Sequence, residues 1–402
     1  MQRISFLGDI ICQIPFLKAA QKRGNDFYTA FSKINSVLNE SDFVVANLET
    51  PIAGEDSGYS NELYSFNTPA ALLDSLKKLN IDLYLTVNNH CLDRGVSGLK
   101  NTLLELDKRG MKHTGTSLIN DNHSFFQKKI GNTSCAFLAY TSNINEDKWD
   151  LYKNELNKIG LNQIIDIEKY LQYRTAYREK NIHFYKLRKK LGKFVSHSFE
   201  MKIKNMFGIK VKPVYDNEPL VEVGGLFIEN VKNTIHTIKE KNDIVFLLPH
   251  CGGQFNTKPG NLSKEIFIKL FNFGADAVIG GHPHTIQDCG YYDNKPYAYS
   301  LGNVSTSSSY FFSVKESLPE YGMIFHTYIE SNKIIKSSFT LIKMIEDKDH
   351  YITIYPIDEL AKKLNKDQLS LLKNDVSNIL GRISGISDTQ DILREYELTT
   401  KK

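Results

Sequence analysis

Two carboxylates, four histidines and three side-chain amides of this 402-residue chain stand in five short polar motifs, each following an apolar run. The five motifs are Gly8-Asp9, Asn47-Leu48-Glu49, Asn88-Asn89-His90, Pro249-His250 and Gly281-His282-Pro283-His284. Divalent ions such as Mn²⁺, Fe²⁺ and Zn²⁺ accept carboxylate, imidazole and amide oxygen together, and Mg²⁺ is compatible with the oxygen ligands. A carboxylate can also bridge two ions. The motifs therefore predict a centre of two divalent metal ions.

The motifs differ in how specific they are. The turn 281–284 is the strongest signal, because two imidazoles two residues apart can each reach a different ion. Asn89 can offer an amide oxygen while His90 faces substrate and Asp93 orients its ring. Taken singly, each motif also has a structural explanation, such as a cap on the helix expected to begin near Val96. Their joint occurrence after apolar runs favours the metal site.

The apolar runs are rich in β-branched and aromatic residues, which predicts buried strands. They are Ile4–Leu7, Phe43–Ala46, Leu83–Val87, Ile244–Leu248 and Ala277–Ile279. Helical periodicity lies between them, in Pro69–Leu79, Val96–Gly110 and Ser263–Phe273. This alternation predicts an α/β fold with helices on the faces of a sheet, and ligands bind such sheets at the carboxyl ends of strands.

The domain organisation predicted from these patterns is a main domain, 1–345, interrupted by a helical insertion at about 145–219. The insertion is rich in Lys, Tyr and Phe, with helical spacing in Leu161–Tyr177 and Ile182–Phe194. Strands are expected at Tyr297–Leu301, Met323–Ile329 and Ile334–Ile342. Residues 346–402 form a C-terminal helical segment, with helical spacing in Ile357–Ile379, and a tail expected to fray from Ser384.

Positive charge is concentrated in the insertion. The chain carries a net charge of +4, but the stretch 178–212 alone has eleven Lys or Arg against two Glu, a local charge of +9. With its aromatic residues it could form a lid that steers an anionic substrate, a contact to a membrane surface, or a solvated helical face. The aromatic residues are Tyr173, Tyr177, Phe184, Tyr185 and Phe194. The weak overall charge and the lack of a recognised nucleic-acid-binding module argue against nucleic acid as a binding partner.

The five cysteines show no C-x-x-C spacing, which predicts free thiols instead of a disulfide framework or a zinc–cysteine site. No apolar stretch approaches the roughly 20 residues that a membrane helix needs. The N-terminal sequence MQRISFLGDI does not have the pattern of a signal peptide. We therefore expect a cytoplasmic protein. The sequence gives no indication of its oligomeric state.

In the order and sequences of its motifs, the chain resembles the bacterial capsule synthesis proteins related to the poly-gamma-glutamate synthesis protein CapA. That family is similar to the calcineurin-like metallophosphoesterases. The matching strings, between residues 6 and 303, are FLGDI, ANLETPI, TVNNHCLDRG, LPHCGG, GADAVIGGHPHTIQ and YSLGN. The resemblance implies a metallophosphoesterase sandwich, in which two packed mixed sheets are flanked by helices.

The resemblance also implies roles for individual residues. Asp9 and His284 would hold one ion, and Asn89, His250 and His282 the other. Glu49 would bridge the two ions in place of the usual aspartate. His90 would be the general acid, with Asp93 beside it. Substrate contacts are expected from polar side chains of the same motifs, at Asn47, Asn88, Gln254 and Asn303.

The chain departs from the family pattern at three positions. The superfamily motif D-x-H reads Asp9-Ile10-Ile11 here, so one histidine ligand is missing and the ion at Asp9 is expected to bind weakly. Members of the capsule family that it resembles carry Glu at two further positions, where this chain has Gln254 and Gly290. The departures leave the substrate open.

The function expected from the resemblance is a phosphatase or phosphodiesterase for an anionic phosphorylated intermediate of capsule or cell-surface polymer synthesis. Two ions lower the pKa of a bridging water, and His90 gives a proton to the leaving oxygen. One alternative is metal-dependent amide hydrolysis or transfer on a glutamate-rich polymer. Another is a non-catalytic partner of a capsule synthase, which the missing histidine would suit.

Overall fold

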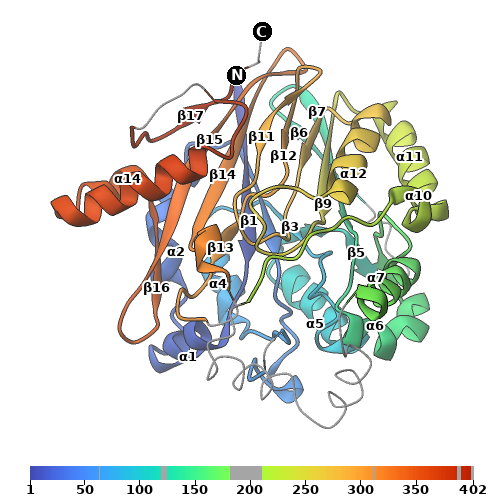
Figure 1. Ribbon diagram of the computed structural model, residues 1–402, viewed down its shortest axis with the longest axis horizontal. Coiled ribbons are helices and arrows are strands. Elements are labelled where there is room, and N and C mark those ends of the chain that lie inside the picture. Colours follow the sequence, from blue (N-terminus) through green and yellow to red (C-terminus); the bar gives the residue numbers. More distant parts are fainter. Residues whose placement is uncertain (63, 119–124, 182–210, 311–312, 387–390, 400–402) are drawn as a thin grey trace.

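Two mixed β-sheets pack face to face, and helices cover their outer faces (Figure 1). The computed structural model describes residues 1–402 except 63, 119–124, 182–210, 311–312, 387–390 and 400–402. The predicted α/β sandwich of two mixed sheets is confirmed.

The larger sheet has nine strands, in the order β16-β15-β14-β1-β2-β3-β4, with β13 beside β1 and β17 beside β15. Strands β1 to β4 and β13 run parallel, whereas β14 to β17 are antiparallel to their neighbours. The strands are β1 (Gln2–Ile10), β2 (Phe43–Leu48), β3 (Leu83–Leu85), β4 (Lys112–Thr114), β13 (Asn303–Ser305), β14 (Tyr321–Glu330), β15 (Lys333–Glu346), β16 (Ile352–Pro356) and β17 (Tyr396–Glu397).

The smaller sheet has six strands in the order β11-β12-β10-β9-β7-β6, with a parallel centre and antiparallel edges. Its strands are β6 (Phe126–Ile130), β7 (Thr133–Thr141), β9 (Ile244–His250), β10 (Ala277–Ile279), β11 (Cys289–Tyr292) and β12 (Lys295–Ala298). A separate antiparallel pair is formed by β5 (Thr116–Leu118) and β8 (Ile159–Leu161). The parallel strands of both sheets thus bring several carboxyl ends to one region.

Helices fill the two outer layers and the ends of the sandwich (Figure 1). Against the larger sheet lie α1 (Ile14–Lys22), α2 (Tyr28–Phe31), α3 (Asn35–Leu38) and α4 (Ala71–Lys77). Against the smaller sheet lie α7 (Ile167–Asn181), α10 (Leu220–Val223), α11 (Gly225–Lys239) and α12 (Asn261–Asn272). The remaining α-helices of the described residues are α5 (Gly95–Lys108), α6 (Glu146–Tyr152), α13 (Ile357–Ala361) and α14 (Lys366–Leu380).

The alternation of side chains along the strands divides the core into layers. Phe6 of β1 and Phe246 of β9 point between the two sheets, where their ring centroids are 5.2 Å apart. Their neighbours Leu7 and Leu247 point outward, toward the helices on either side. Each fully buried apolar side chain of this kind contributes about 1.5–3 kcal/mol to folding. Both faces of these strands are therefore buried, which fixes the register that positions the polar residues at their ends.

The segment 145–219 is only partly helical in the described residues. Leu161, expected in a helix, pairs with Thr116 in β5 and β8, and α7 begins six residues later, at Ile167. The strand forms there because this three-residue stretch finds a pairing partner in space, which outweighs its helical spacing. The predicted helix 182–194 and its residues Phe184, Tyr185 and Phe194 lie outside the described residues.

The C-terminal segment is more closely tied to the fold than expected. The tail expected to fray from Ser384 instead contributes β17, where Tyr396 is buried and stacks on Phe339 of β15 at 5.2 Å. Burial of this ring outweighs the polar character of its surroundings. Strand β15 extends across position 345 and β16 follows it in the same sheet, and the predicted division of the chain there stays a prediction.

Among the described residues, no helix is both long enough and apolar enough to cross a membrane. All five cysteines are free and buried, as predicted.

Candidate metal centre

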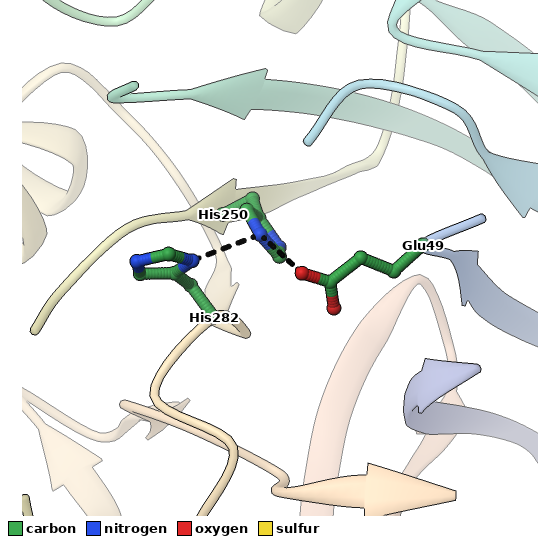
Figure 2. Close-up of side chains that lie close together, drawn as sticks. All are labelled: Glu49, His250 and His282. Atoms are coloured by element: carbon green, nitrogen blue, oxygen red, sulfur yellow. Dashed lines mark hydrogen bonds and ion pairs between the residues drawn. The ribbon is translucent and has the colours of Figure 1, made fainter. Parts of the chain in front are cut away.

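The six predicted ligands meet where strands of both sheets end. The larger sheet brings them from β1, β2 and the turn after β3, and the smaller sheet from β9 and the turn after β10. All six are buried, at 0–7% exposure, and they are Asp9, Glu49, Asn89, His250, His282 and His284. Figure 2 shows Glu49 on one side of His250 and His282 on the other. The strand-end positions inferred from sequence thus become one cluster.

The first set of donors, called the four-donor group, consists of Glu49, Asn89, His250 and His282. Asn89 Oδ1 lies 2.8 Å from His250 Nε2 and 3.2 Å from His282 Nδ1. His250 Nε2 lies 3.3 Å from Glu49 Oε1 and 3.2 Å from His282 Nδ1 (Figure 2). Atoms that each bind one ion at about 2.1 Å are about 3 Å from one another. The group can therefore hold a divalent ion.

The second set, called the three-donor group, consists of Asp9, Glu49 and His284, whose candidate ligand atoms all lie within 4.8 Å of one another. Its spacing is wider, at 3.4 Å from Asp9 Oδ2 to His284 Nδ1 and 3.8 Å from Glu49 Oε1 to His284 Nε2. Asn303 Oδ1 lies 3.0 Å from His284 Nδ1 and can accept a hydrogen bond from a protonated Nδ1, which would leave Nε2 as the ligand.

Glu49 gives the clearest test of whether these residues fit a metal. It is fully buried and belongs to both groups, yet among the described residues neither of its side-chain oxygens has a hydrogen-bond partner. A buried carboxylate without hydrogen bonds is costly, because nothing replaces the water it has lost. Cations on either side would compensate that cost. The donor set and the shared carboxylate thus fit a pair of divalent ions.

The turn that carries two of the histidines is held in a strained conformation. His282 has φ 99° and His284 has φ 56°, both in the left-handed region, where a non-glycine residue costs about 1–3 kcal/mol. The backbone N–H of His282 donates to Asp9 Oδ2 at 3.1 Å. A Cβ on Gly281 would lie 2.7 Å from Asp9 Oδ1, so glycine is required here. The turn is therefore fixed around the Asp9 carboxylate.

The protonation preferences of the two groups differ. Burial lowers the pKa of His284, but the charge of Glu49 and the hydrogen bond and charge of Asp9 outweigh it and raise this pKa to about 9. Burial raises the pKa of Asp9, but its contacts with His284 and the charge of His250 bring it down to about 2. In contrast, burial and the neighbouring charges lower the pKa of His282 well below its usual value.

His90 lies beside the ligands, held by Asp93 as predicted. Its Nδ1 is 2.7 Å from Asp93 Oδ2, and its Nε2 is 4.0 Å from Glu49 Oε1. Asp93 is itself fixed by the backbone N–H of Phe66, at 2.7 Å, and by Asn145 Nδ2, at 3.2 Å. Burial lowers the pKa of His90, but the charge and hydrogen bond of Asp93 outweigh it and raise the pKa. The imidazole can thus carry a proton toward the metal ligands.

Three of the four residues expected to contact substrate are engaged with protein groups. Asn47 Nδ2 donates to Asp9 Oδ1 at 2.7 Å. Asn88 Nδ2 donates to the carbonyl of Leu48 at 2.9 Å. Asn303 Nδ2 donates to the carbonyls of residues 284 and 319. These amides support the ligands from behind, whereas Gln254 lines two pockets beside the site.

Two residues of the site were not identified from the sequence. Asn145 joins two predicted site residues, because its Oδ1 accepts from Asn89 Nδ2 at 2.9 Å while its Nδ2 donates to Asp93 Oδ1. Arg174 of α7 lines a pocket that Asn89 and His282 also line. Asn145 follows a strand end, which is a weak signal, but nothing in the spacing of Arg174 predicts its position.

The position of the missing D-x-H histidine is occupied by a buried aliphatic side chain. Ile11 is 3% exposed and shares the lining of a small cavity, of about 20 Å³, with His90 and His284. Its backbone N–H donates to Ser305 Oγ at 3.1 Å. The three-donor group therefore gains no ligand from this strand beyond Asp9.

Comparison with known proteins yields one family and several relatives. The family model for the bacterial capsule synthesis protein PGA_cap matches residues 3–307. The PGA biosynthesis protein CapA of Bacillus subtilis (strain 168) is 23% identical over 302 residues, covering 74% of this chain and 62% of the relative. The capsule biosynthesis protein CapA of Bacillus anthracis is 19% identical over 304 residues, covering 75% and 58% respectively.

Solved structures with some similarity include a hypothetical protein from Thermus thermophilus and the 5'-nucleotidase of Candida albicans SC5314. The first is 13% identical with a TM-score of 0.36, covering 88% of this chain and 97% of that chain. The second is 12% identical with a TM-score of 0.37, covering 94% and 57% respectively.

The chain spans about 60% of the length of the two CapA relatives. The family match extends over about three quarters of the chain and includes all six of the clustered ligands. The resemblance inferred from the motifs is confirmed, and the chain belongs to the bacterial capsule synthesis protein PGA_cap family.

Proposed function

We propose that the protein is a metal-dependent phosphoesterase, a phosphatase or phosphodiesterase, that acts on an anionic intermediate of capsule or cell-surface polymer synthesis. The observation that carries the proposal is the buried Glu49 carboxylate, which is shared by two donor groups and has no hydrogen-bond partner in the part of the chain that the structure describes. The link to capsule synthesis is supported by the family and by the names of the CapA relatives.

The donor set suits Mn²⁺, Fe²⁺ or Zn²⁺, with Mg²⁺ as a weaker candidate, because nitrogen and oxygen ligands are mixed. When bound, two such ions supply a hydroxide at neutral pH and neutralise charge on a phosphoryl group. Glu49, with Asn89, His250 and His282 on one side and with Asp9 and His284 on the other, would hold them. Asn145 and Asn303 would keep Asn89 and His284 oriented.

His90 is the residue placed to move a proton. Asp93 binds Nδ1, which leaves Nε2 directed toward the metal ligands. The Phe66 ring lies 4.4 Å from the imidazole, centroid to centroid, and restricts its rotation. A protonated Nε2 can then donate to the oxygen that leaves phosphorus, and general acids of this kind contribute about 10²–10⁴-fold to rate.

Hydrolysis of an aryl phosphate monoester and diester by the metal-stripped protein, with Mn²⁺, Zn²⁺, Fe²⁺ or Mg²⁺ added back, tests the proposal. We expect metal-dependent turnover that falls about 10²–10⁴-fold in His90→Ala without loss of bound metal. His236→Ala, at an exposed position of α11, is the matched control and should behave like the parent. Two ions bound per chain with no turnover of either ester would contradict the proposal, and cleavage of an amide substrate instead would favour the amide-directed alternative.

A further inference from the structure

A polar pocket of about 190 Å³ opens beside the four-donor group. Asn89 and His282 line it from the metal side, and Arg174 and Arg178 line it from α7. Asn143, Asn145 and Gln254 add further polar side chains. The volume is more than ten times the roughly 10–15 Å³ that one water molecule needs. The pocket therefore has room for a charged group of a substrate that is bound at the metals.

The two arginines are presented by one face of α7. Tyr170, Arg174 and Arg178 are four residues apart, so they lie in a row along the helix. Tyr170 is 1% exposed, and its hydroxyl accepts a hydrogen bond from Arg174 Nη1 at 2.9 Å. The buried tyrosine thus anchors the row, and Arg174 is held in the pocket wall instead of extending into solvent.

The arginines are only partly neutralised by carboxylates. Arg174 Nε lies 3.5 Å from Glu218 Oε1, and Arg178 Nη1 lies 3.1 Å from Glu146 Oε2. Glu146 lines the pocket but Glu218 does not, so two cationic side chains face the pocket with one carboxylate. Within the described part of the chain, Arg174 Nη2 has no hydrogen-bond partner. A planar guanidinium with a free N–H edge suits a phosphate or carboxylate.

We propose that this pocket binds a second anionic group of the substrate, a phosphoryl or carboxylate group separated by a few bonds from the phosphoester at the metals. Arg174 makes the main contact and Arg178 a supporting one. The inference rests on the proposed function for the location of the scissile phosphoester. It narrows the substrate class to phosphoesters that carry a second anionic group elsewhere in the molecule.

Three small molecules distinguish the possible charged groups: glycerol 3-phosphate, 3-phosphoglycerate and 1,3-propanediol bisphosphate. Binding to the metal-loaded protein is measured by titration calorimetry, which needs no turnover. Both other ligands carry a second anionic group. We expect at least one of them to bind on the order of tenfold more tightly than glycerol 3-phosphate, which corresponds to one charge-assisted hydrogen bond. A gain for 3-phosphoglycerate alone assigns a carboxylate, and a gain for the bisphosphate alone assigns a phosphoryl group.

The variants Arg174→Gln and Arg178→Gln should reduce this preference, the first to about threefold or less, while the affinity for glycerol 3-phosphate stays within about twofold. Arg174→Lys keeps a positive charge beside the buried Glu218, so this variant avoids the destabilisation that an unpaired Glu218 would cause. It should keep part of the preference. Lys169→Gln removes one charge from the same helix at an exposed position outside the pocket, and should keep all of it.

Equal affinity for the three ligands in the parent protein would overturn the inference. So would an undiminished preference in both Arg174→Gln and Arg174→Lys. Failure of the proposed function is a separate result, because it is read from aryl phosphate turnover and not from binding. If the protein prefers ligands with a second anionic group through Arg174 but cleaves no ester, the pocket inference stands and the phosphoesterase proposal fails.

Discussion

The two donor groups share one carboxylate but are built differently on either side of it. The four-donor group has three ligands of its own, with contacts of 2.8–3.3 Å among its donor atoms. The three-donor group has only Asp9 and His284 besides Glu49, at 3.4–3.8 Å. It also carries the histidine with the raised pKa, whereas His282 of the other group has a lowered one.

This difference indicates how strongly each group should hold an ion. The four-donor group is complete, and the lowered pKa of His282 means that this ligand has no proton to release to an ion. The three-donor group must release a proton from His284 and has no histidine at position 11. We therefore expect two unequal binding steps, the tighter at the four-donor group.

The largest effect is expected for Glu49→Gln, because this change removes the ligand that both groups share. An amide has no negative charge to bridge two cations, so both binding steps weaken. Aryl phosphate turnover should fall on the order of 10²–10³-fold or more. The rise in melting temperature on adding Mn²⁺ should also vanish, since an ion at a hundred times its Kd stabilises a protein by about 2.7 kcal/mol.

The matched control is Glu240→Gln, at an exposed position at the end of α11. It should keep full turnover and the full metal-dependent shift in melting temperature. If Glu49→Gln still bound two ions with unchanged affinity, the carboxylate would not be shared and the contrast between the two groups would lose its basis.

The second effect concerns pH. Metal-free His284 carries its proton at pH values below its raised pKa of about 9, and an ion bound at its Nε2 requires that proton to leave. Affinity at the three-donor group should thus rise with pH, about tenfold per unit between pH 7 and that pKa. His282 has no proton to release in this range. Calorimetric Mn²⁺ titrations at pH 7 and 8 check whether only the weaker step tightens.

His284→Gln provides the control, since a glutamine offers an amide oxygen and no titrating nitrogen. The variant should bind the second ion weakly, with little change between pH 7 and 8. Equal pH slopes for both steps in the parent protein would show that protonation does not separate the two groups.

The smallest effect is a gain. Ile11→His places an imidazole beside His284, at the position of the missing ligand, and should complete the three-donor group. The second ion should bind at least about tenfold more tightly, the lower end of what even outer-sphere partners contribute to metal sites. Ile11→Phe is a bulky change without a ligand atom. If both variants bound the second ion equally well, donor number would not explain the weaker step.

The ligands could be predicted from the sequence because each lies in a polar motif directly after an apolar run, and parallel strands end at the same edge. The apolar runs alone predicted an α/β sheet with helices on its faces, and the sandwich of two sheets followed from the family resemblance. Strands β8 and β17 could not be predicted: they include Gly160 and Glu397 and make no apolar run, and they form because Leu161 and Tyr396 find partners in space. Arg174 and Asn145 depend on tertiary packing of α7 and of the turn after β7, which local sequence does not record.

The predicted amide contacts illustrate a further limit. Asn47, Asn88 and Asn303 belong to the right motifs, but the sequence does not tell a side chain that faces substrate from one that supports a ligand. Hydrogen bonds to Asp9, Leu48 and His284 distinguish the two cases. Substrate contacts therefore have to be sought in the pocket walls, where Gln254 and Arg174 lie.

The most direct test of the shared metal centre is an anomalous difference map from crystals of the protein grown with Mn²⁺. We predict two peaks on opposite sides of the Glu49 carboxylate, the stronger one among Asn89, His250 and His282 and the weaker one beside Asp9 and His284. A map with no peak at Glu49, or with the His282 and His284 rings turned away from it, would contradict the account.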